Sequence, residues 1–388
     1  MKTIGKRLAA IAVIGALAIG AGGCSSDRGG SGGGTDTPAS GESGGDAAAG
    51  GECAFTTDGL VGVAMPTKSL ERWNRDGADL QKLLEDMGYQ VDLQYADNKP
   101  EMQISQLENM INAGAEVLVV ASIDGEALGP VLETAAEKGI PVIAYDRLIK
   151  GTEAVDYYAS FDNEKVGTLQ GQYIEEFIKS GEGPYNFEMF AGSPDDNNAR
   201  FFFKGAFDVL QPYLEDGTLV VQSGKQPKSV DDWQSIGIQG WDGSAAQSEM
   251  ENRLNSYYRD KKVNIVLSPN DSLALGIAEA LQANGYEAGS ADYPILTGQD
   301  ADEANVNNIL AGAQSMTVWK DTRELGKVVS NMVNEIMTCS EVTVNNTEDY
   351  NNDVKVVPSY LLDPVVVTKE NVKEMLVDSG FLPDLKVS

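Results

Sequence analysis

Apolar runs separated by amphipathic segments occur along most of the chain, the pattern expected of strands that alternate with helices. The clearest run, Val-Leu-Val-Val-Ala at 117–121, is typical of a strand that is buried on both faces. A second apolar run covers 140–144, and between the two runs apolar residues recur at helical spacing over 131–136 before Gly139. The pattern therefore predicts a β-α-β unit with two parallel, neighbouring strands.

The same alternation extends to both sides of this unit, with an irregular joint at 157–161. We expect strands at 60–65, 89–95, 155–160, 186–190, 219–222, 264–268, 295–297 and 315–319, and two short strands within 354–367. Helices are expected at 163–179, 197–214, 244–258, 272–283 and 321–338, and around the apolar helical faces at Leu80 and Leu107. Two successive blocks of this kind predict an α/β fold with two doubly wound parallel-sheet lobes joined by a hinge, rather than one (β/α)8 barrel.

Polar side chains follow the two central strands where each strand ends. Asp124 comes after the first strand, and Asp146 and Arg147 come directly after the second. Ligands of open α/β sheets bind outside the carboxyl ends of the strands, so these residues are candidates for a small-molecule site. The alternatives are a surface ion pair for Asp146 and Arg147, and a helix N-cap for Asp124, which is compatible with a role in binding.

Further candidates lie in loops, most of them after other predicted strands: Lys68, Arg72, Trp73, Trp241, Asn270, Asp271, Gln299, Asp300 and Lys320. Carboxylates accept hydrogen bonds, Lys and Arg donate them, and aromatic rings offer an apolar face, which together match a neutral sugar. Lys68 and Arg72 could instead be solvated at a helix start, and Trp73 and Trp241 could be core or loop aromatics. The charges of the candidates nearly cancel, which suits an uncharged polyol better than an ion.

Several of these residues belong to longer motifs that occur in order. The motifs are Ser-Ile-Asp-Gly at 122–125, Ala-Tyr-Asp-Arg-Leu-Ile at 144–149, Phe-Asp-Asn-x-x-Val-Gly at 161–167, Gly-Ser-Pro-Asp-Asp-Asn-Asn at 192–198 and Gly-Gln-Asp-Ala-Asp at 298–302. Over residues 58–386 the chain resembles the xylose-binding and multiple-monosaccharide-binding (ChvE-like) periplasmic proteins of sugar ABC transporters.

The resemblance implies a type I periplasmic-binding-protein fold in which the chain crosses between lobes three times. It implies an N-terminal lobe of 55–161 plus 321–345 and a C-terminal lobe of 162–318 plus 346–388. The function implied is capture of a monosaccharide, such as xylose, glucose or galactose, for delivery to an ABC permease. By the resemblance, Asn197 and Asn198 donate hydrogen bonds to the sugar, and Lys320 lies at a hinge crossing.

The composition narrows the functional classes. The formal net charge is −30, which disfavours nucleic acid and anionic lipid headgroups as partners. The chain has no histidine, so the common Ser-His and Cys-His nucleophile arrangements are excluded. No calcium-loop spacing is present, so we expect no metal ion. We also expect no cofactor and a monomeric protein.

The N-terminus predicts export. Lys2, Lys6 and Arg7 precede an apolar stretch at 8–19, and Ala-Gly-Gly-Cys at 21–24 resembles a lipoprotein cleavage site. We therefore expect a lipoprotein signal peptide over 1–23, lipid modification of Cys24 and a flexible Gly/Ser-rich tether over 24–54. The protein would be extracytoplasmic and anchored to the cell membrane. The alternative is an ordinary secretory peptide with a spare cysteine.

Cys53 and Cys339 are the two other cysteines. Cys53 precedes the first strand, and Cys339 ends a helix that would run antiparallel to the strands, so both are expected at the same edge of the sheet. In an oxidising compartment this placement predicts a Cys53–Cys339 disulfide. The alternative is two buried free thiols.

Three rival functions share parts of this pattern. A glycoside hydrolase could use two of the aspartates, although Arg and Lys partners would keep them ionised. A sugar-responsive repressor would need a basic helix-turn-helix before the first lobe, where an export signal stands instead. A sugar sensor for a chemoreceptor or sensor kinase is compatible with binding and transport. We favour a binding protein over an enzyme.

Overall fold

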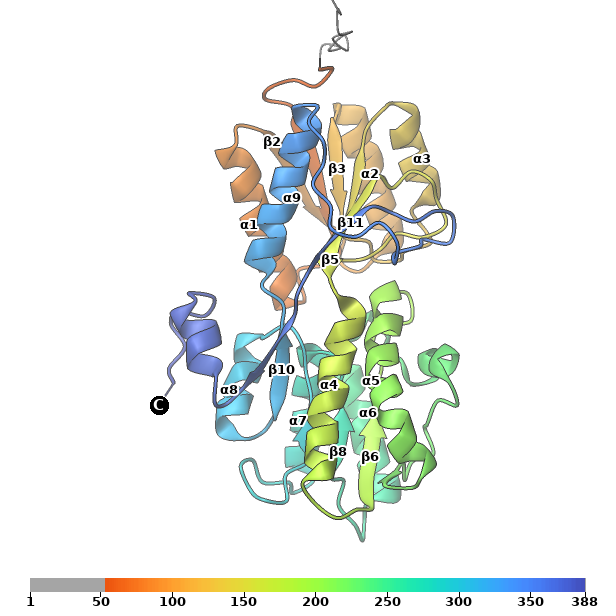
Figure 1. The fold of residues 1–388 in the computed structure, drawn as a ribbon, viewed down its shortest axis with the longest axis vertical. Coiled ribbons are helices and arrows are strands. Elements are labelled where there is room, and N and C mark those ends of the chain that lie inside the picture. The colour runs from red at the N-terminus through yellow and green to blue at the C-terminus, as the bar shows by residue number, and fades with distance from the viewer. Residues whose placement is uncertain (1–52, 388) are drawn as a thin grey trace, which may run out of the picture. The chain divides into compact units, whose positions relative to one another are not determined.

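A computed structural model of the chain describes residues 53–387, and this part folds into two α/β lobes linked by three crossings of the chain (Figure 1). The predicted signal peptide, Cys24 and most of the predicted tether lie outside the described residues. Among residues 53–387, no helix combines the length and the apolar character that a membrane span requires.

The first lobe is built on a six-stranded parallel sheet. Its strand order is β2 (Gln90–Tyr95), β1 (Leu60–Met65), β3 (Val117–Val120), β4 (Val142–Tyr145), β5 (Tyr157–Phe161) and β11 (Ser359–Leu362). The predicted β-α-β unit is confirmed, because β3 and β4 pair in parallel with Val119 opposite Ile143. The sheet has two free edges, so the alternative of a closed barrel is wrong.

Helices cover both faces of this sheet. Successive residues of a strand point to opposite faces, and in β1 Val61 and Val63 pack with α1 (Glu71–Asp86) and α9 (Thr322–Met337). Ala64 packs on the other side with α2 (Pro100–Ala113) and α3 (Gly129–Glu137). Because both faces are buried, the central strands are continuously apolar, which is the reason that the sequence identifies them.

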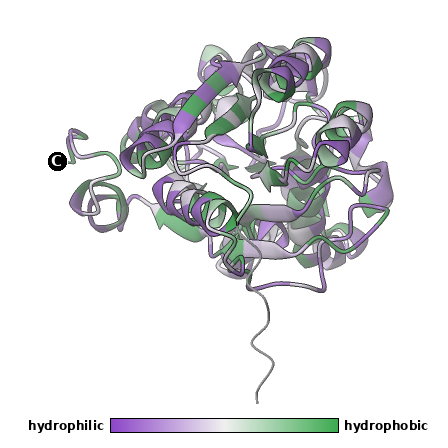
Figure 2. Ribbon diagram, turned by 90° about the horizontal axis from the view of Figure 1, so that it is seen from above, coloured by the Kyte–Doolittle hydropathy of each residue, from purple (hydrophilic) through white to green (hydrophobic). Residues whose placement is uncertain are grey.

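The second lobe repeats this arrangement. Its parallel sheet has the order β7 (Leu219–Val220), β6 (Tyr185–Met189), β8 (Ile265–Leu267) and β9 (Ile295–Leu296). The helices of this lobe are α4 (Asn163–Lys179), α5 (Asn197–Glu215), α6 (Gly243–Tyr257), α7 (Asp271–Ala283) and α8 (Glu303–Ala311). The sequence analysis did not predict α8. Most helices carry both hydrophilic and hydrophobic positions (Figure 2), as expected for helices with one face on a sheet.

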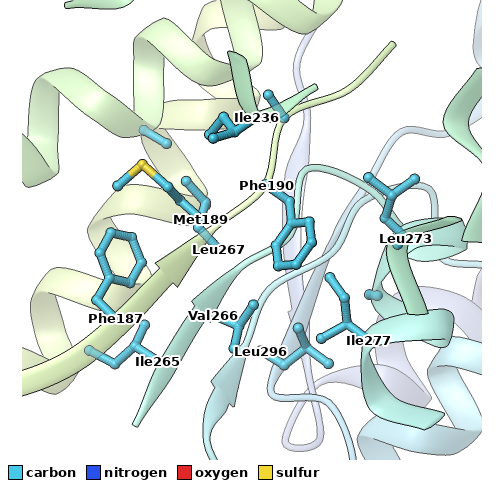
Figure 3. Close-up of a cluster of buried hydrophobic side chains, with 14 of the residues drawn as sticks. Phe187, Met189, Phe190, Ile236, Ile265, Val266, Leu267, Leu273, Ile277 and Leu296 are labelled. Carbon is cyan, nitrogen blue, oxygen red and sulfur yellow. The ribbon is translucent and has the colours of Figure 1, made fainter. Parts of the chain in front are cut away.

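Side chains of the short strands form the core of the second lobe (Figure 3). Phe187 and Ile265 lie side by side on β6 and β8, and Leu273 and Ile277 of α7 pack over the sheet. The helices α4 and α5 approach closely at Gly167. A Cβ atom at this position would lie only 1.9 Å from the carbonyl oxygen of Phe202, so the close approach requires glycine. This contact holds α5 close to α4, and the first turns of α5 carry residues of the site described below.

The third crossing differs from the prediction. The chain was expected to leave the first lobe at 345, but β11 joins the first-lobe sheet by parallel pairing with β5. The main-chain nitrogen of Asn345 also donates to Ser359, and Tyr350 packs against Tyr158 with ring centroids 5.1 Å apart. The crossing follows β11, and β12 (Val365–Thr368) pairs in antiparallel fashion with β10 (Met316–Trp319) of the second lobe. The free edge of β5 provides the hydrogen-bonding partner that keeps 346–362 on the first lobe.

The structure joins Cys53 to Cys339 with 2.11 Å between the two sulfur atoms and 5.7 Å between the two Cα atoms. The pairing agrees with the one expected from the sequence. Phe55 packs against the core of the first lobe, and Thr56 donates to Glu116 just before β3. The first lobe therefore includes Cys53 and Ala54, which the sequence analysis assigns to the tether.

Candidate functional site

A small cavity lies between the lobes and is lined from both of them, and we call it the central cavity. Its lining residues are Leu70, Arg72, Trp73, Asp146, Arg147, Asp196, Asn198, Phe202, Trp241, Asn270, Gln299, Asp300 and Lys320. Most of them follow the carboxyl ends of strands, as the sequence analysis expects for a ligand site. The cavity measures ≈ 20 Å³, which is room for about one water molecule. A ring-sized ligand therefore requires the lobes or the lining side chains to move apart.

Arg72 occupies the first turn of α1 and forms the centre of a buried ion-pair network. Its guanidinium nitrogens lie 2.7 Å from Asp76, 2.9 Å from Asp146 and 3.6 Å from Asp300. Lys320 completes the network at 3.0 Å from Asp300 and 4.0 Å from Asp146. Burial alone would lower the pKa of Arg72, but the surrounding carboxylates raise it well above its usual value. The network joins the two lobes, since Asp300 belongs to the second.

Asp146 is held in place through both its side chain and its main chain. Its main-chain carbonyl accepts hydrogen bonds from Tyr158 and Asn198, each at 2.8 Å, and from Ser160 at 2.7 Å. Burial would raise the pKa of its carboxyl, but Arg72, Lys320 and Arg147 outweigh burial and lower it. Asp146 therefore stays ionised and offers a hydrogen-bond acceptor.

Three cavity residues other than glycine have a positive φ: Asp146 at 61°, Trp241 at 57° and Asp300 at 101°. Such conformations are rare for these residue types and are found mainly where the surrounding structure imposes them, often at ligand sites. The strained backbone marks the same three strand ends and loops that carry the polar groups of the cavity.

Asp196 links the lobes at the opposite wall. Its carboxylate lies 2.9 Å from Nε of Arg147 and accepts a hydrogen bond from the Trp241 indole at 3.1 Å. Its other oxygen accepts from the main-chain nitrogen of Asn198 and so caps α5. Burial raises the pKa of Asp196, while Arg147 acts in the opposite direction. The orientation of Trp241 in the cavity therefore depends on a charged residue that also anchors a helix.

Aromatic rings enclose these charges. The Arg72 and Arg147 guanidinium groups lie 4.3 Å and 5.1 Å from the Trp73 ring centroid. The Lys320 ammonium lies 5.5 Å from the ring of Phe202. Trp241 meets Phe202 edge-on at 6.3 Å. Apolar ring faces beside donors and acceptors match a ligand that has both C–H faces and hydroxyl groups.

Some buried polar atoms of the cavity residues have no hydrogen-bond partner within residues 53–387: Nε of Arg72, Nε1 of Trp73 and Oε1 of Gln299. A buried polar group without a partner costs about 1–3 kcal/mol. Two of these atoms are donors and one is an acceptor, so a ligand that both donates and accepts would satisfy them.

Four predicted ligand residues lie outside the central cavity. Lys68 is exposed and lies over the Tyr95 ring. Asp124 accepts from the main-chain nitrogens of Glu126 and Ala127 in the turn before α3, and it is not the helix N-cap weighed as its alternative, because α3 begins at Gly129 with Leu128 at its N-cap. Asn197 and Asp124 line a separate groove. Asp271 is buried beneath the cavity, where Gln314 and Thr317 donate to it. The ten other predicted residues line the cavity.

The sequence analysis did not include three lining residues, namely Leu70, Asp196 and Phe202. Asp196 lies within the motif at 192–198, but its two oxygens divide between a helix cap and the cavity, which the sequence alone does not reveal. Phe202 follows Asn198 by one helical turn, so helical spacing on α5 was a usable signal. Leu70 carried no signal, because single apolar residues in loops are common.

Within the described part of the chain, His, Cys, Asp and Glu side chains form no group of three or more that could hold a metal ion. Guanidinium and ammonium groups provide the positive charge of the cavity. These groups donate hydrogen bonds, so the cavity can bind a ligand through the hydrogen bonds of its side chains.

Comparison with known proteins agrees with this geometry. Residues 61–339 match the family model described as periplasmic binding protein domain. The chain is 50% identical over 331 residues to the multiple sugar-binding periplasmic receptor ChvE of Rhizobium radiobacter, covering 84% of this chain and 92% of that protein. It is 37% identical over 321 residues to the D-xylose-binding periplasmic protein of Escherichia coli (strain K12), covering 83% and 90%.

Solved structures show the same fold. A crystal structure of an ABC transporter solute-binding protein from Clostridium phytofermentans with bound β-D-glucose matches with a TM-score of 0.80 and 52% identity, covering 84% of this chain and 100% of that one. The curated relatives are described as binding proteins and receptors. The chain belongs to the periplasmic binding protein family and has its type I fold.

Proposed function

We propose that this protein is an exported, lipid-anchored solute-binding protein that captures a monosaccharide between its lobes and delivers it to an ABC sugar permease. The observation that carries the proposal is the central cavity, where three cations (Arg72, Arg147 and Lys320) face carboxylates from both lobes. Such a site offers donors and acceptors without a large net charge, which suits a neutral polyol. The relatives at 50% and 37% identity are named for sugar binding.

Binding would proceed by exchange of partners. Sugar hydroxyls donate to Asp146 and Asp300 and accept from Arg72 and Lys320, replacing part of the ion pairing between these groups. The C–H face of the ring packs against the aromatic wall formed with Trp73. Because the polar groups come from both lobes, the sugar gains its full set of contacts only when the lobes are closed. This difference in affinity between the open and closed forms is what drives closure.

The test is calorimetric titration of a soluble form of residues 52–388, refolded to remove carried-over sugar, with xylose, glucose, galactose and arabinose. We expect binding to one or more of them in roughly the micromolar range. Asp146→Asn should abolish it, because the substitution removes an ionised acceptor and leaves Arg72 and Lys320 unbalanced. Asp124→Asn is the matched control and should bind normally, since Asp124 lies outside the cavity. A folded protein that binds none of the four sugars would refute the monosaccharide assignment.

The anchor and the partners have separate tests. Replacement of Cys24 by Ser should release the protein from the membrane fraction when it is expressed with its signal peptide. Product analysis with glycosides addresses the alternative of a hydrolase, and sugar cleavage that is lost in Asp146→Asn would favour it. A role as a sugar sensor for a chemoreceptor or sensor kinase would appear as sugar-dependent association with that receptor.

A further inference from the structure

The C-terminal segment, residues 372–387, packs against the second lobe. Val372, Leu376 and Phe381 share a buried cluster with Trp319 of β10 and with residues of α8. Phe381 meets Trp319 edge-on with ring centroids 5.3 Å apart. Figure 1 shows the segment beside α8 and β10. It is therefore anchored to the second lobe by apolar contacts.

The same segment also contacts the first lobe. The guanidinium carbon of Arg75, on α1, lies 4.7 Å from the Phe381 ring centroid. The guanidinium carbon of Arg323, on α9, lies 5.3 Å from the same centroid, and its Nη1 donates to the main-chain oxygen of Ser379 at 3.1 Å. The Phe381 ring thus contacts two cations of the opposite lobe, a favourable arrangement for a ring face.

Arg75 has a second contact across the lobes. Its Nη2 lies 3.6 Å from Asp302, which precedes α8 in the second lobe, while Nη1 pairs with Glu71 of its own helix at 2.8 Å. Nε and Nη2 of Arg75 are buried without a hydrogen-bond partner within residues 53–387. The Phe381 ring and the Asp302 carboxylate, both of the other lobe, thus offset part of the free-energy cost of burying this guanidinium group.

The position of Arg75 connects this contact to the central cavity. Arg75 follows Arg72 by about one turn of the same helix, and Arg72 faces Asp300 of the second lobe. Because a helix moves as a rigid element, an opening that separates Arg72 from Asp300 also withdraws Arg75 from Phe381 and Asp302.

We infer that Arg75 and Phe381 form a second contact between the lobes that is made on closure and sets how tightly and how long a sugar is held, without reading which sugar it is. The inference rests on the proposed function. A contact that stabilises only the closed form raises the population that binds, so it changes the apparent affinity for every ligand by the same factor.

The experiment is a double-mutant cycle of Arg75→Ala and Phe381→Ala, with calorimetric titration and stopped-flow dissociation for two sugars that the wild-type protein binds. Each single variant should weaken both sugars by roughly threefold to tenfold, chiefly through faster dissociation. The ratio of the two affinities should not change. The loss in the double variant should be smaller than the sum of the two single losses, because both single changes remove the contact between Arg75 and Phe381.

Two further variants keep the result interpretable. Phe381→Leu preserves an apolar side chain against Trp319 but removes the ring face, so it should weaken binding while the melting temperature of the sugar-free protein is nearly unchanged. Lys373→Ala alters an exposed residue of the same segment that pairs with Asp378 and should change nothing. If Phe381→Ala does not fold, Phe381→Leu and Arg75→Ala test the same contact.

Wild-type affinity in both single variants, additive effects, or a change in the ratio of the two sugars would each overturn the inference and leave the proposed function standing. Failure of the wild-type protein to bind any sugar would instead remove the proposed function, and the inference with it.

Discussion

Two carboxylates beyond strand ends, the buried Asp146 of the first lobe and the partly buried Asp302 of the second, have pKa values displaced in opposite directions. Burial acts on both to raise the pKa. At Asp146, Arg72, Lys320 and Arg147 overcome it and lower the pKa. At Asp302, burial and the neighbouring Asp300 and Glu71 raise the pKa to about 7, although Arg75 and Arg72 act in the opposite direction.

The difference shows what the cations of the cavity achieve. Where guanidinium and ammonium groups surround an aspartate, the carboxylate stays ionised and can accept hydrogen bonds from hydroxyl groups. Where carboxylates crowd together, as with Asp302 and Asp271, a proton relieves the repulsion, and burial likewise raises the pKa of Asp271 well above its usual value. The same residue type after strand ends therefore has a proposed role in binding in one case and a structural role in the other.

The largest expected effect comes from removing the central cation. Arg72→Met keeps the length of the side chain but leaves Asp76 without an ion-pair partner and removes the closest cation from Asp146. Breaking a buried pair in this way typically costs about 3–5 kcal/mol of stability. Sugar binding should become undetectable by calorimetry, and urea unfolding should give the loss of stability. Lys68→Met is the control, since Lys68 is exposed and outside the cavity. Near-normal binding by Arg72→Met would show that the cations do not define the site.

A smaller effect, with a distinctive pH dependence, is expected from Asp302→Asn. The folded-state pKa of about 7 lies above the unfolded value of about 3.8, so the folded protein binds this proton more tightly. The stabilising contribution is present at low pH and is lost as the pH rises through about 7. The variant cannot ionise, so its stability should rise relative to wild type between about pH 4 and 7, by roughly 1 kcal/mol or more. Chemical unfolding at several pH values measures it.

Asp146→Asn provides the opposite case. The contribution of Asp146 is present above the unfolded pKa and is lost only as the pH falls below it, because its folded-state pKa is lowered. This variant should be less stable than wild type throughout the range above about pH 4. Stability curves for the two variants that run parallel to each other would contradict the comparison.

A smaller effect on sugar binding than that of Arg72→Met is expected at the opposite wall. Trp241→Phe retains an aromatic ring but loses the hydrogen bond to Asp196. A hydrogen bond to a charged group contributes about 1.5–3 kcal/mol, and the Arg147 partner of Asp196 remains, so we expect the lower end of this range and roughly tenfold weaker sugar binding. Trp233→Phe, another buried tryptophan of the second lobe that does not line the cavity, should leave the affinity unchanged. Equal losses in both variants would indicate a general packing effect.

The sequence predicts the two-lobe fold well because fully buried parallel strands leave long apolar runs, as at 117–121. It also predicts most of the cavity, since Asp146 and Lys320 directly follow apolar strands and Gln299 lies shortly after another. It does not reveal which strand-end residues turn inwards. Asp271 and Asp300 both follow apolar strands, but only Asp300 lines the cavity. Asp271 is the first residue of α7, and its side chain is buried beneath the cavity. The position of the third crossing is not predictable for another reason. The sequence of β11 does not show which of the two sheets offers the free edge with which it pairs.

The disulfide has a mechanical consequence for a protein that is proposed to be held by its N-terminus. Cys53 lies before β1, at the amino ends of the first-lobe strands, whereas the cavity lies at their carboxyl ends. A pull on the chain that precedes Cys53 is transmitted through the sulfur bridge to the end of α9 as well as to the loop before β1. The load would thus be shared between a helix and a central strand of the lobe that carries Arg72 and Asp146.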